Sequence, residues 1–228
     1  MKKASPHIGT LNEKPLHEAL KKWYARPHDR FEVPVDGSVA DIVRGKQIIE
    51  IQTKNFAAIR RKLEKLLAKH KVRLVYPIAA EKWIVRDSPK AKIMRRLSPK
   101  RGDYLDIFNE LLRIPHLIAH PNFSLELVLI KEEESRVYDG KRGWRRGYWV
   151  IEERRLLEVM ESKTVKSAKG LEAFLPKDLP CPFTTTDLAK ALQKNPFFAR
   201  KMAYCLKRAG CIQQVGKKGN FLLYKKQN

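Results

Sequence analysis

Cysteine, acidic residues and long apolar runs are all scarce in this chain of 228 residues. The three cysteines, Cys181, Cys205 and Cys211, are an odd number without metal-ligand spacing, which excludes a disulfide framework and a cysteine metal site. No stretch approaches the roughly 18 uninterrupted apolar residues of a membrane span, and the first residues lack the apolar run of a signal peptide. A phosphate-loop sequence is also missing, so nucleotide hydrolysis is not predicted. We therefore expect a cytoplasmic protein that does not associate with membranes.

The shortage of acidic residues leaves the chain strongly basic. It has 25 Asp and Glu against 48 Lys and Arg, which gives a formal net charge of +23. Two basic segments stand out, residues 82–101 and 181–228, and each contains a single acidic residue. A field of this sign attracts polyanions, so nucleic acid is the expected partner. The alternative is that lysine-rich faces only keep the protein in solution.

Apolar residues make up 43% of the chain, enough for a sizeable core, and their spacing predicts the order of elements. The spacing is helical in residues 15–26 and 56–70, where the apolar positions recur every three or four residues. It has a period of two in residues 31–35, 39–43 and 48–52, and a short apolar run follows at 72–78. The predicted order is αβββαβ, which is typical of a compact α/β unit.

Changes in composition divide the chain into three predicted segments. Residues 1–100 contain the α/β core, and residues 101–165 form an α+β extension with a helix at 104–112 and strands at 125–130 and 148–151. Within the extension, residues 136–146 are rich in Arg and Gly, which predicts an exposed basic hairpin. Residues 163–169 are expected to be a linker, and residues 179–228 a small separate domain.

The last segment resembles a winged helix-turn-helix domain, because two helices precede a basic hairpin with its tip at residues 216–220. Its second helix begins at Asn195-Pro196 and ends near Ala209, and its apolar spacing buries one side. In such domains the second helix enters the major groove of duplex DNA and the wing contacts the backbone. The resemblance implies groove contacts by Arg200 and Lys201, with Lys207 and Arg208 on the same helix and Lys217 and Lys218 at the wing tip.

The hairpin around Gly45-Lys46 brings polar side chains together on strands that are otherwise Val and Ile. A two-residue turn there sets a pairing in which partner numbers sum to 91, so Asp41 faces Glu50. Gln52 shares a strand face with Glu50 because side chains alternate with a period of two. Two opposed carboxylates destabilise a sheet unless a cation lies between them, which points to a divalent metal. A polar hairpin face neutralised by Arg and Lys is the structural alternative.

These residues resemble the motif of the PD-(D/E)XK nuclease superfamily, closest to its Holliday-junction resolvase-like members, over roughly residues 10–80. The resemblance implies a restriction endonuclease-like α/β core in which Asp41 and Glu50 bind Mg²⁺ or Mn²⁺. Gln52 occupies the position of the lysine that activates water in the family, and Lys54 is a candidate to replace it. The family often adds an acid from the first helix, for which Glu13 is the candidate because it lies towards the packed side of the helical wheel.

The expected function is that of a metal-dependent DNA endonuclease that hydrolyses phosphodiester bonds while the winged helix positions the duplex. Double-stranded DNA is the expected partner, a second copy of the chain is a further candidate, and Lys54, Arg60 and Arg61 are candidate phosphate contacts. Two alternatives remain open: a non-catalytic DNA-binding protein that retains the nuclease-like scaffold, and a protein that binds structured RNA. Gln52 favours the non-catalytic alternative.

Overall fold

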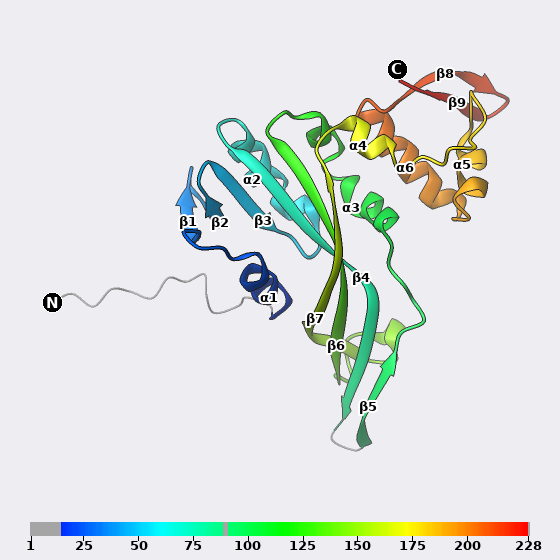
Figure 1. The fold of residues 1–228 in the computed structure, drawn as a ribbon. Helices are drawn as coiled ribbons and strands as arrows, with labels where there is room; N and C mark the ends of the chain where they lie inside the picture. Colours follow the sequence, from blue (N-terminus) through cyan, green and yellow to red (C-terminus); the bar gives the residue numbers. More distant parts are fainter. Residues whose placement is uncertain (1–14, 89–90, 228) are drawn as a thin grey trace.

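The computed structural model describes residues 15–88 and 91–227, and its first part has the predicted order of elements (Figure 1). Glu13, the candidate acid before the first helix, lies outside the described residues. The αβββαβ order is confirmed: the elements are α1 (Pro15–Tyr24), β1 (Arg30–Val35), β2 (Ser38–Arg44), β3 (Gln47–Ile51), α2 (Phe56–Leu67) and β4 (Lys71–Ser88). The chain therefore folds as a mixed α/β protein.

One seven-stranded mixed sheet runs through the body of the molecule, with the order β1-β2-β3-β4-β6-β7 and β5 paired to β4. The meander β1-β2-β3 is antiparallel, whereas β3 runs parallel to β4 and β4 parallel to β6. The remaining strands are β5 (Ala91–Leu97), β6 (Phe123–Tyr138) and β7 (Trp149–Val165). Residues 1–100 and 101–165 thus contribute strands to the same sheet. The prediction of a linker at residues 163–169 is wrong, because β7 continues to Val165 and the helix α4 begins at Ala168.

The two predicted helices cover opposite faces of this sheet. Along β3 the side chains alternate, so that Ile48 packs into the cluster that contains the apolar side of α2, and Ile49 into the cluster with Leu16 and Leu20 of α1. Leu20 is fully buried, and complete burial of a leucine side chain stabilises a fold by about 1.5–3 kcal/mol. The sheet is thereby fixed between two layers of helix.

Beyond this core the strands continue as an arm, formed by β5 with residues 81–88 of β4, 131–138 of β6 and 149–158 of β7 (Figure 1). The base of the arm holds a network of charges around the buried Glu134, which is 1% exposed and pairs with the half-buried Lys82, Arg136 and Arg154. A buried charge without a partner would destabilise the fold, so this network can order the strands because Glu134 is paired with cations. The β6–β7 connection at the end of the arm includes the short helix η4 (Trp144–Arg146).

The segment between β5 and β6 contains short helices that pack on the same side of the sheet as α2. The helix predicted at 104–112 is present as η2 (Tyr104–Ile107) followed by α3 (Phe108–Leu111), and η3 (Pro115–Ala119) comes next. Asp103 is the N-cap of η2, and its side chain accepts a hydrogen bond from the backbone N–H of Leu105 at 2.8 Å. The segment lies between the sheet and the C-terminal unit.

The C-terminal unit contains α4 (Ala168–Glu172), α5 (Thr185–Ala191), α6 (Pro196–Arg208), β8 (Ile212–Lys218) and β9 (Phe221–Lys226). Phe183 forms a bridge with Tyr224 and so adds a third short extended segment beside β9. Thr184 caps α5 through a reciprocal hydrogen-bond pair with Asp187. The predicted burial along α6 is confirmed, because Phe198, Met202, Cys205 and Leu206 are all buried.

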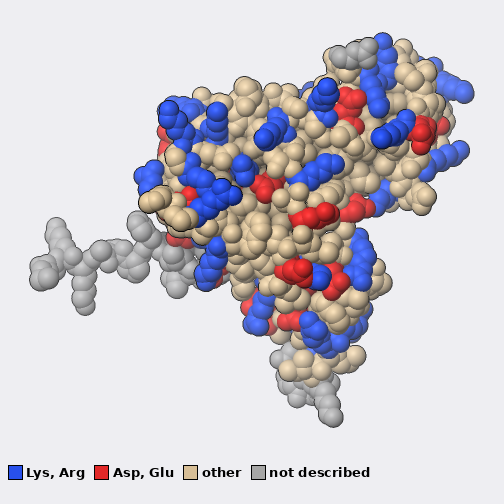
Figure 2. Space-filling view, in the orientation of Figure 1, with Lys and Arg blue, Asp and Glu red and all other residues tan. Residues whose placement is uncertain are grey.

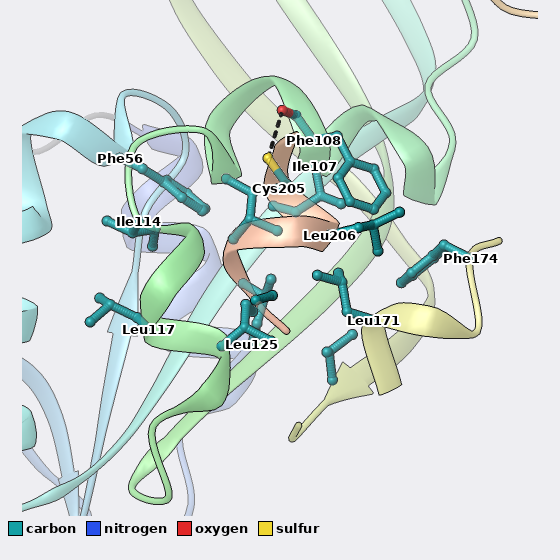
Figure 3. Close-up of a cluster of buried hydrophobic side chains, with 14 of the residues drawn as sticks. Phe56, Ile107, Phe108, Ile114, Leu117, Leu125, Leu171, Phe174, Cys205 and Leu206 are labelled. Atoms are coloured by element: carbon teal, nitrogen blue, oxygen red, sulfur yellow. Dashed lines mark hydrogen bonds between the residues drawn. The ribbon is translucent and has the colours of Figure 1, made fainter. Parts of the chain in front are cut away.

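This unit does not have a core of its own, because its apolar residues belong to the cluster that also fills the space below the sheet. Figure 3 shows Phe108 of α3 beside Cys205 and Leu206 of α6, with the Cys205 thiol 3.9 Å from the carbonyl oxygen of Phe108. The ring of Phe108 also packs edge-on against Phe198, with 6.4 Å between centroids. The prediction of a separate small domain is therefore corrected: the unit is docked on the body by a shared core.

The longest described helix, α6, has 13 residues, and none of the helices in residues 15–88 and 91–227 is both long and apolar enough to cross a membrane.

Candidate active site at the ends of strands β2 and β3

The predicted pairing of the central hairpin is confirmed. Arg44 pairs with Gln47, Val43 with Ile48 and Ile42 with Ile49, so partner numbers sum to 91. Gly45 has a φ of +54°, the backbone conformation that this turn requires at its first position. The ladder ends at Ile42 and Ile49, and Asp41 and Glu50 are the next residues on the two strands. Their carboxylates therefore lie where the hairpin opens.

Asp41 replaces a backbone acceptor at this opening. Its Oδ2 accepts a hydrogen bond from the backbone N–H of Ile51 at 2.7 Å, an amide that has left the β2–β3 ladder. The same oxygen lies 3.2 Å from Nε2 of His17 on α1. Burial opposes ionisation of Asp41, but the contacts with His17 and the Ile51 amide outweigh it and hold the pKa of Asp41 below its usual value. Asp41 is therefore a carboxylate at neutral pH.

Glu50 is the most deeply buried acid of the site, with 1% of its side chain exposed. The ammonium of Lys62 on α2 contacts its Oε2 and also donates to the carbonyl oxygen of Val39 at 2.6 Å. Its other oxygen, Oε1, is buried and has no hydrogen-bond partner among the described residues. Burial and, second, the charge of Asp41 raise the pKa of Glu50 to about 7, which the attraction of Lys62 reduces only in part.

The residues present fit a magnesium or manganese ion in one specific respect. A buried carboxylate oxygen without a partner is costly, and a hard cation would satisfy it. No group of three or more His, Cys, Asp or Glu within the described ranges is placed to hold a metal ion. Mg²⁺ does not need three protein ligands, because it usually keeps several waters and binds one or two carboxylates together with substrate phosphates. Asp41 and Glu50 supply these two carboxylates.

Gln52 does not join the two carboxylates, and the predicted triad is corrected on this point. Its side-chain nitrogen donates to the carbonyl oxygens of Lys54 and Asn55, at 2.5 and 3.3 Å. These bonds hold the loop that leads into α2, where Asn55 adopts a left-handed conformation. The reason is that β3 ends at Ile51, so the alternation of faces no longer controls residue 52. Lys54 is exposed and lines a shallow pocket with Leu16 and residues of β7.

The structure instead brings His17 and Lys62 to the site, two residues that the sequence reasoning missed. Lys62 lies on α2 between Ile59 and Leu66, at the three- and four-residue spacing of the buried side. A lysine inside an apolar helical stripe is the signal that could have identified it. His17 is next to Leu16, on the side of α1 that faces the sheet. Their approach to Asp41 and Glu50 depends on how each helix docks, which periodicity does not reveal.

The candidate phosphate contacts lie on two separate surfaces. On α2, Arg60 and Arg61 are exposed, and Arg60 pairs with Glu64 at 2.9 Å. They line an open cavity of about 560 Å³ with Arg113. Figure 2 shows lysine and arginine side chains spread over the body and over the C-terminal unit, with acidic groups between them on the same face.

On the C-terminal unit, the Nζ of Lys201, a predicted groove contact, donates to Oδ1 of Asn109 at 2.9 Å and so lies towards the body. Arg200 is exposed, and its guanidinium lies 5.9 Å from the ring centroid of Phe197. Lys207 donates to Gln214 of β8 at 3.0 Å. The other predicted contacts are exposed, and they are Arg208 on α6 and Lys217 and Lys218 on β8.

Comparison with known proteins places this architecture in a family. Residues 14–166 match a family described as a domain of unknown function, DUF8091. The chain belongs to the DUF8091 family. An uncharacterized protein of Treponema pallidum (strain Nichols) is 33% identical over 222 residues, which cover 96% of this chain and 88% of that protein. No solved structure matches the chain.

The extent of the DUF8091 match agrees with the sheet. It begins at the start of α1 and stops at the end of β7, so the domain contains Asp41, Glu50, His17 and Lys62 and the whole arm. The C-terminal unit lies outside the DUF8091 domain. Because the Treponema protein aligns over 96% of the chain, the unit has a counterpart there.

Proposed function

We propose that this DUF8091 protein is a metal-dependent DNA endonuclease with a PD-(D/E)XK-like core and a winged-helix-like C-terminal unit. The observation that carries the proposal is the buried Glu50, whose Oε1 has no hydrogen-bond partner in the part of the chain that the structure describes, beside the ionised Asp41 at the open end of a hairpin. The surrounding arrangement supports it: an antiparallel meander leads into a parallel strand, with one helix on each face. The net charge of +23 favours a polyanionic substrate.

In this proposal Asp41 and Glu50 hold the ion. A magnesium or manganese ion bound there would lower the pKa of a coordinated water and polarise the scissile phosphate. The residues of the chain prepare this site in two ways. The Ile51 amide and His17 fix the carboxylate of Asp41, and burial of Glu50 leaves one of its oxygens without a hydrogen bond from any described residue.

Lys62 takes the place of the lysine that the family pattern expects at position 52. Its ammonium is in contact with Glu50 and its side chain is 23% exposed, so it can reach solvent beside the carboxylates. A cation at that position orients water and stabilises negative charge that develops on a phosphate. Gln52 supports the loop below α2 and has no part in the chemistry proposed.

Duplex DNA is proposed to lie against α6 and the β8–β9 hairpin. The exposed side of α6 repeats at helical spacing and contains Phe197, Arg200, Tyr204, Lys207 and Arg208. Lys217 and Lys218 lie on β8 near the turn of the hairpin and are exposed. A basic helix followed by a basic hairpin is the surface that winged helices present to a groove and its flanking phosphates.

A plasmid assay tests the proposal. The full chain is incubated with supercoiled plasmid and Mg²⁺ or Mn²⁺, and Glu50→Gln and Asp41→Asn are compared with Glu18→Gln. Glu18 is a suitable control because it lies on the exposed side of α1, where it pairs with Lys22. We expect nicking by the wild type and by Glu18→Gln, none with EDTA, and none by the two site variants. Equal nicking by Glu50→Gln would exclude this site.

The second candidate is a non-catalytic DNA-binding protein, and the contact of Lys62 with Glu50 favours it. A lysine that already neutralises the buried acid gives Glu50 a structural role that needs no metal. Calorimetry with Mn²⁺ separates the two. Binding that is lost in Glu50→Gln supports the nuclease, whereas DNA binding without any Mn²⁺ binding or cleavage supports the scaffold.

A further inference from the structure

The end of the arm is a loop built to hold one shape. Asp139 organises it: its carboxylate accepts hydrogen bonds from the backbone amides of Lys141 and Arg142, at 3.3 and 2.7 Å, and from the Arg142 guanidinium at 2.9 and 2.6 Å. These bonds, those of Arg142 above all, lower the pKa of Asp139 to about 2. Gly143 has a φ of +80°, and a Cβ there would lie 2.9 Å from the carbonyl oxygen of Trp149. The loop is therefore fixed by its own residues.

This fixed loop presents an indole to solvent. Trp144 is 69% exposed, and the guanidinium of Arg145 lies 5.2 Å from its ring centroid. Tyr138 and Tyr148 at the adjoining strand ends are 53% and 41% exposed. The lone acid of residues 136–146 is Asp139, whose carboxylate is already engaged in the loop. The outward surface thus combines exposed aromatic rings with the exposed basic side chains of Lys141, Arg142 and Arg145.

We infer that this arm tip is a second DNA contact, in which Trp144 stacks on an unpaired base while the neighbouring basic residues contact phosphates. The inference rests on the proposed function and names its substrate class as DNA that joins a duplex to a single-stranded segment. An aromatic ring with basic neighbours is the combination that binds single strands, because every base has a face on which an indole can stack. Insertion into intact duplex would first require unstacking of base pairs.

The position of the tip agrees with a separate role. Figure 1 shows the arm projecting away from the C-terminal unit, so the surface proposed for duplex and the arm tip are at different ends of the molecule. Charge favours nucleic acid over an apolar protein surface as the partner, because the tip presents the exposed basic side chains of Lys141 and Arg145 beside the indole, in addition to Arg142, which is paired with Asp139. A DNA that contacts both surfaces must extend along the body.

The test measures DNA affinity by fluorescence anisotropy in EDTA, so that cleavage plays no part. A forked DNA with single-stranded ends is compared with a blunt duplex of the same paired sequence, using the wild type, Trp144→Ala, Trp144→Phe and Trp23→Ala. Trp23 is the matched control, because it is also exposed, at 52%, but lies on α1. We expect Trp144→Ala to weaken fork binding at least about fivefold and blunt-duplex binding less than twofold. Trp144→Phe should retain most of the fork affinity, and Trp23→Ala all of it.

Equal affinity of Trp144→Ala and wild type for the fork would overturn the inference, as would an equal loss on both DNAs. A change in self-association of Trp144→Ala, seen by light scattering without a change in DNA affinity, would show a protein contact instead. Failure of the proposed function is distinguishable: fork binding that depends on Trp144 without any plasmid nicking leaves the arm contact intact and removes the nuclease. Absence of all DNA binding removes both.

Discussion

Glu50 makes the stability of this protein depend on pH in a direction that can be calculated. Its pKa is about 7 in the folded protein against 4.5 when the group is unperturbed, because burial and Asp41 disfavour the charged form. A raised pKa means that the folded state holds the proton more tightly. The contribution of the Glu50 proton to the free energy of unfolding is therefore complete below pH 4.5, and it is lost as the pH rises through 7. A shift of this size corresponds to about 3 kcal/mol.

The perturbation is Glu50→Gln, which keeps the shape of the side chain and removes the titration. We expect the free energy of unfolding of the wild type to fall, relative to that of Glu50→Gln, by up to about 3 kcal/mol between pH 4.5 and pH 8. Urea unfolding at several pH values in EDTA measures this difference in the free energy of unfolding, and Glu18→Gln serves as the exposed control. The difference between variant and wild type reports Glu50 together with its interaction with Asp41, because all other titrating groups are shared. Parallel curves for the two proteins would refute the buried, proton-binding Glu50.

Three further predictions concern other parts of the molecule. Lys62→Met should lower plasmid nicking at least about 100-fold while the affinity for duplex DNA stays within about twofold, since the lysine contacts Glu50 and not the duplex surface. Arg200→Ala should weaken duplex binding and flatten its salt dependence by about one unit, whereas Lys201→Ala, which loses its bond to Asn109 and its contact with the ring of Phe197, should leave both unchanged in a salt titration. Phe108→Ala should destabilise the chain by about 3–5 kcal/mol in urea unfolding and leave a single transition, because body and C-terminal unit share one core; two separated transitions would contradict that core.

Local patterns in the sequence were sufficient to predict the meander and the pairing of its central hairpin. The period of two placed β2 and β3, and the Gly45 turn then fixed which residues oppose each other. The buried side of α6 was likewise predicted from spacing, because a helix repeats regularly over its whole length. These features depend on residues close together in the chain.

The remaining features depend on contacts between distant residues. Lys62 reaches Glu50 only because α2 docks on the sheet face where Glu50 points, and Gln52 turns away because the strand stops one residue earlier. The strand predicted at 148–151 is the beginning of a 17-residue strand whose polar residues pair with those of β6 in the arm. A charged stretch of this kind has no hydrophobic alternation, so its strand structure follows from its neighbours.

The parallel pairing of β4 with β6 has a consequence for how the protein is made. The two strands pair from Val72 and Phe123 to Asp87 and Val137, so the partner of each paired β4 residue is synthesised about fifty residues later. During that interval the apolar residues 72–78 have β3 as their neighbour on one edge and no strand on the other. Strand edges of this kind pair readily with other chains. A ribosome that stalls before β6 is complete would therefore release a chain that aggregates rather than a smaller folded domain.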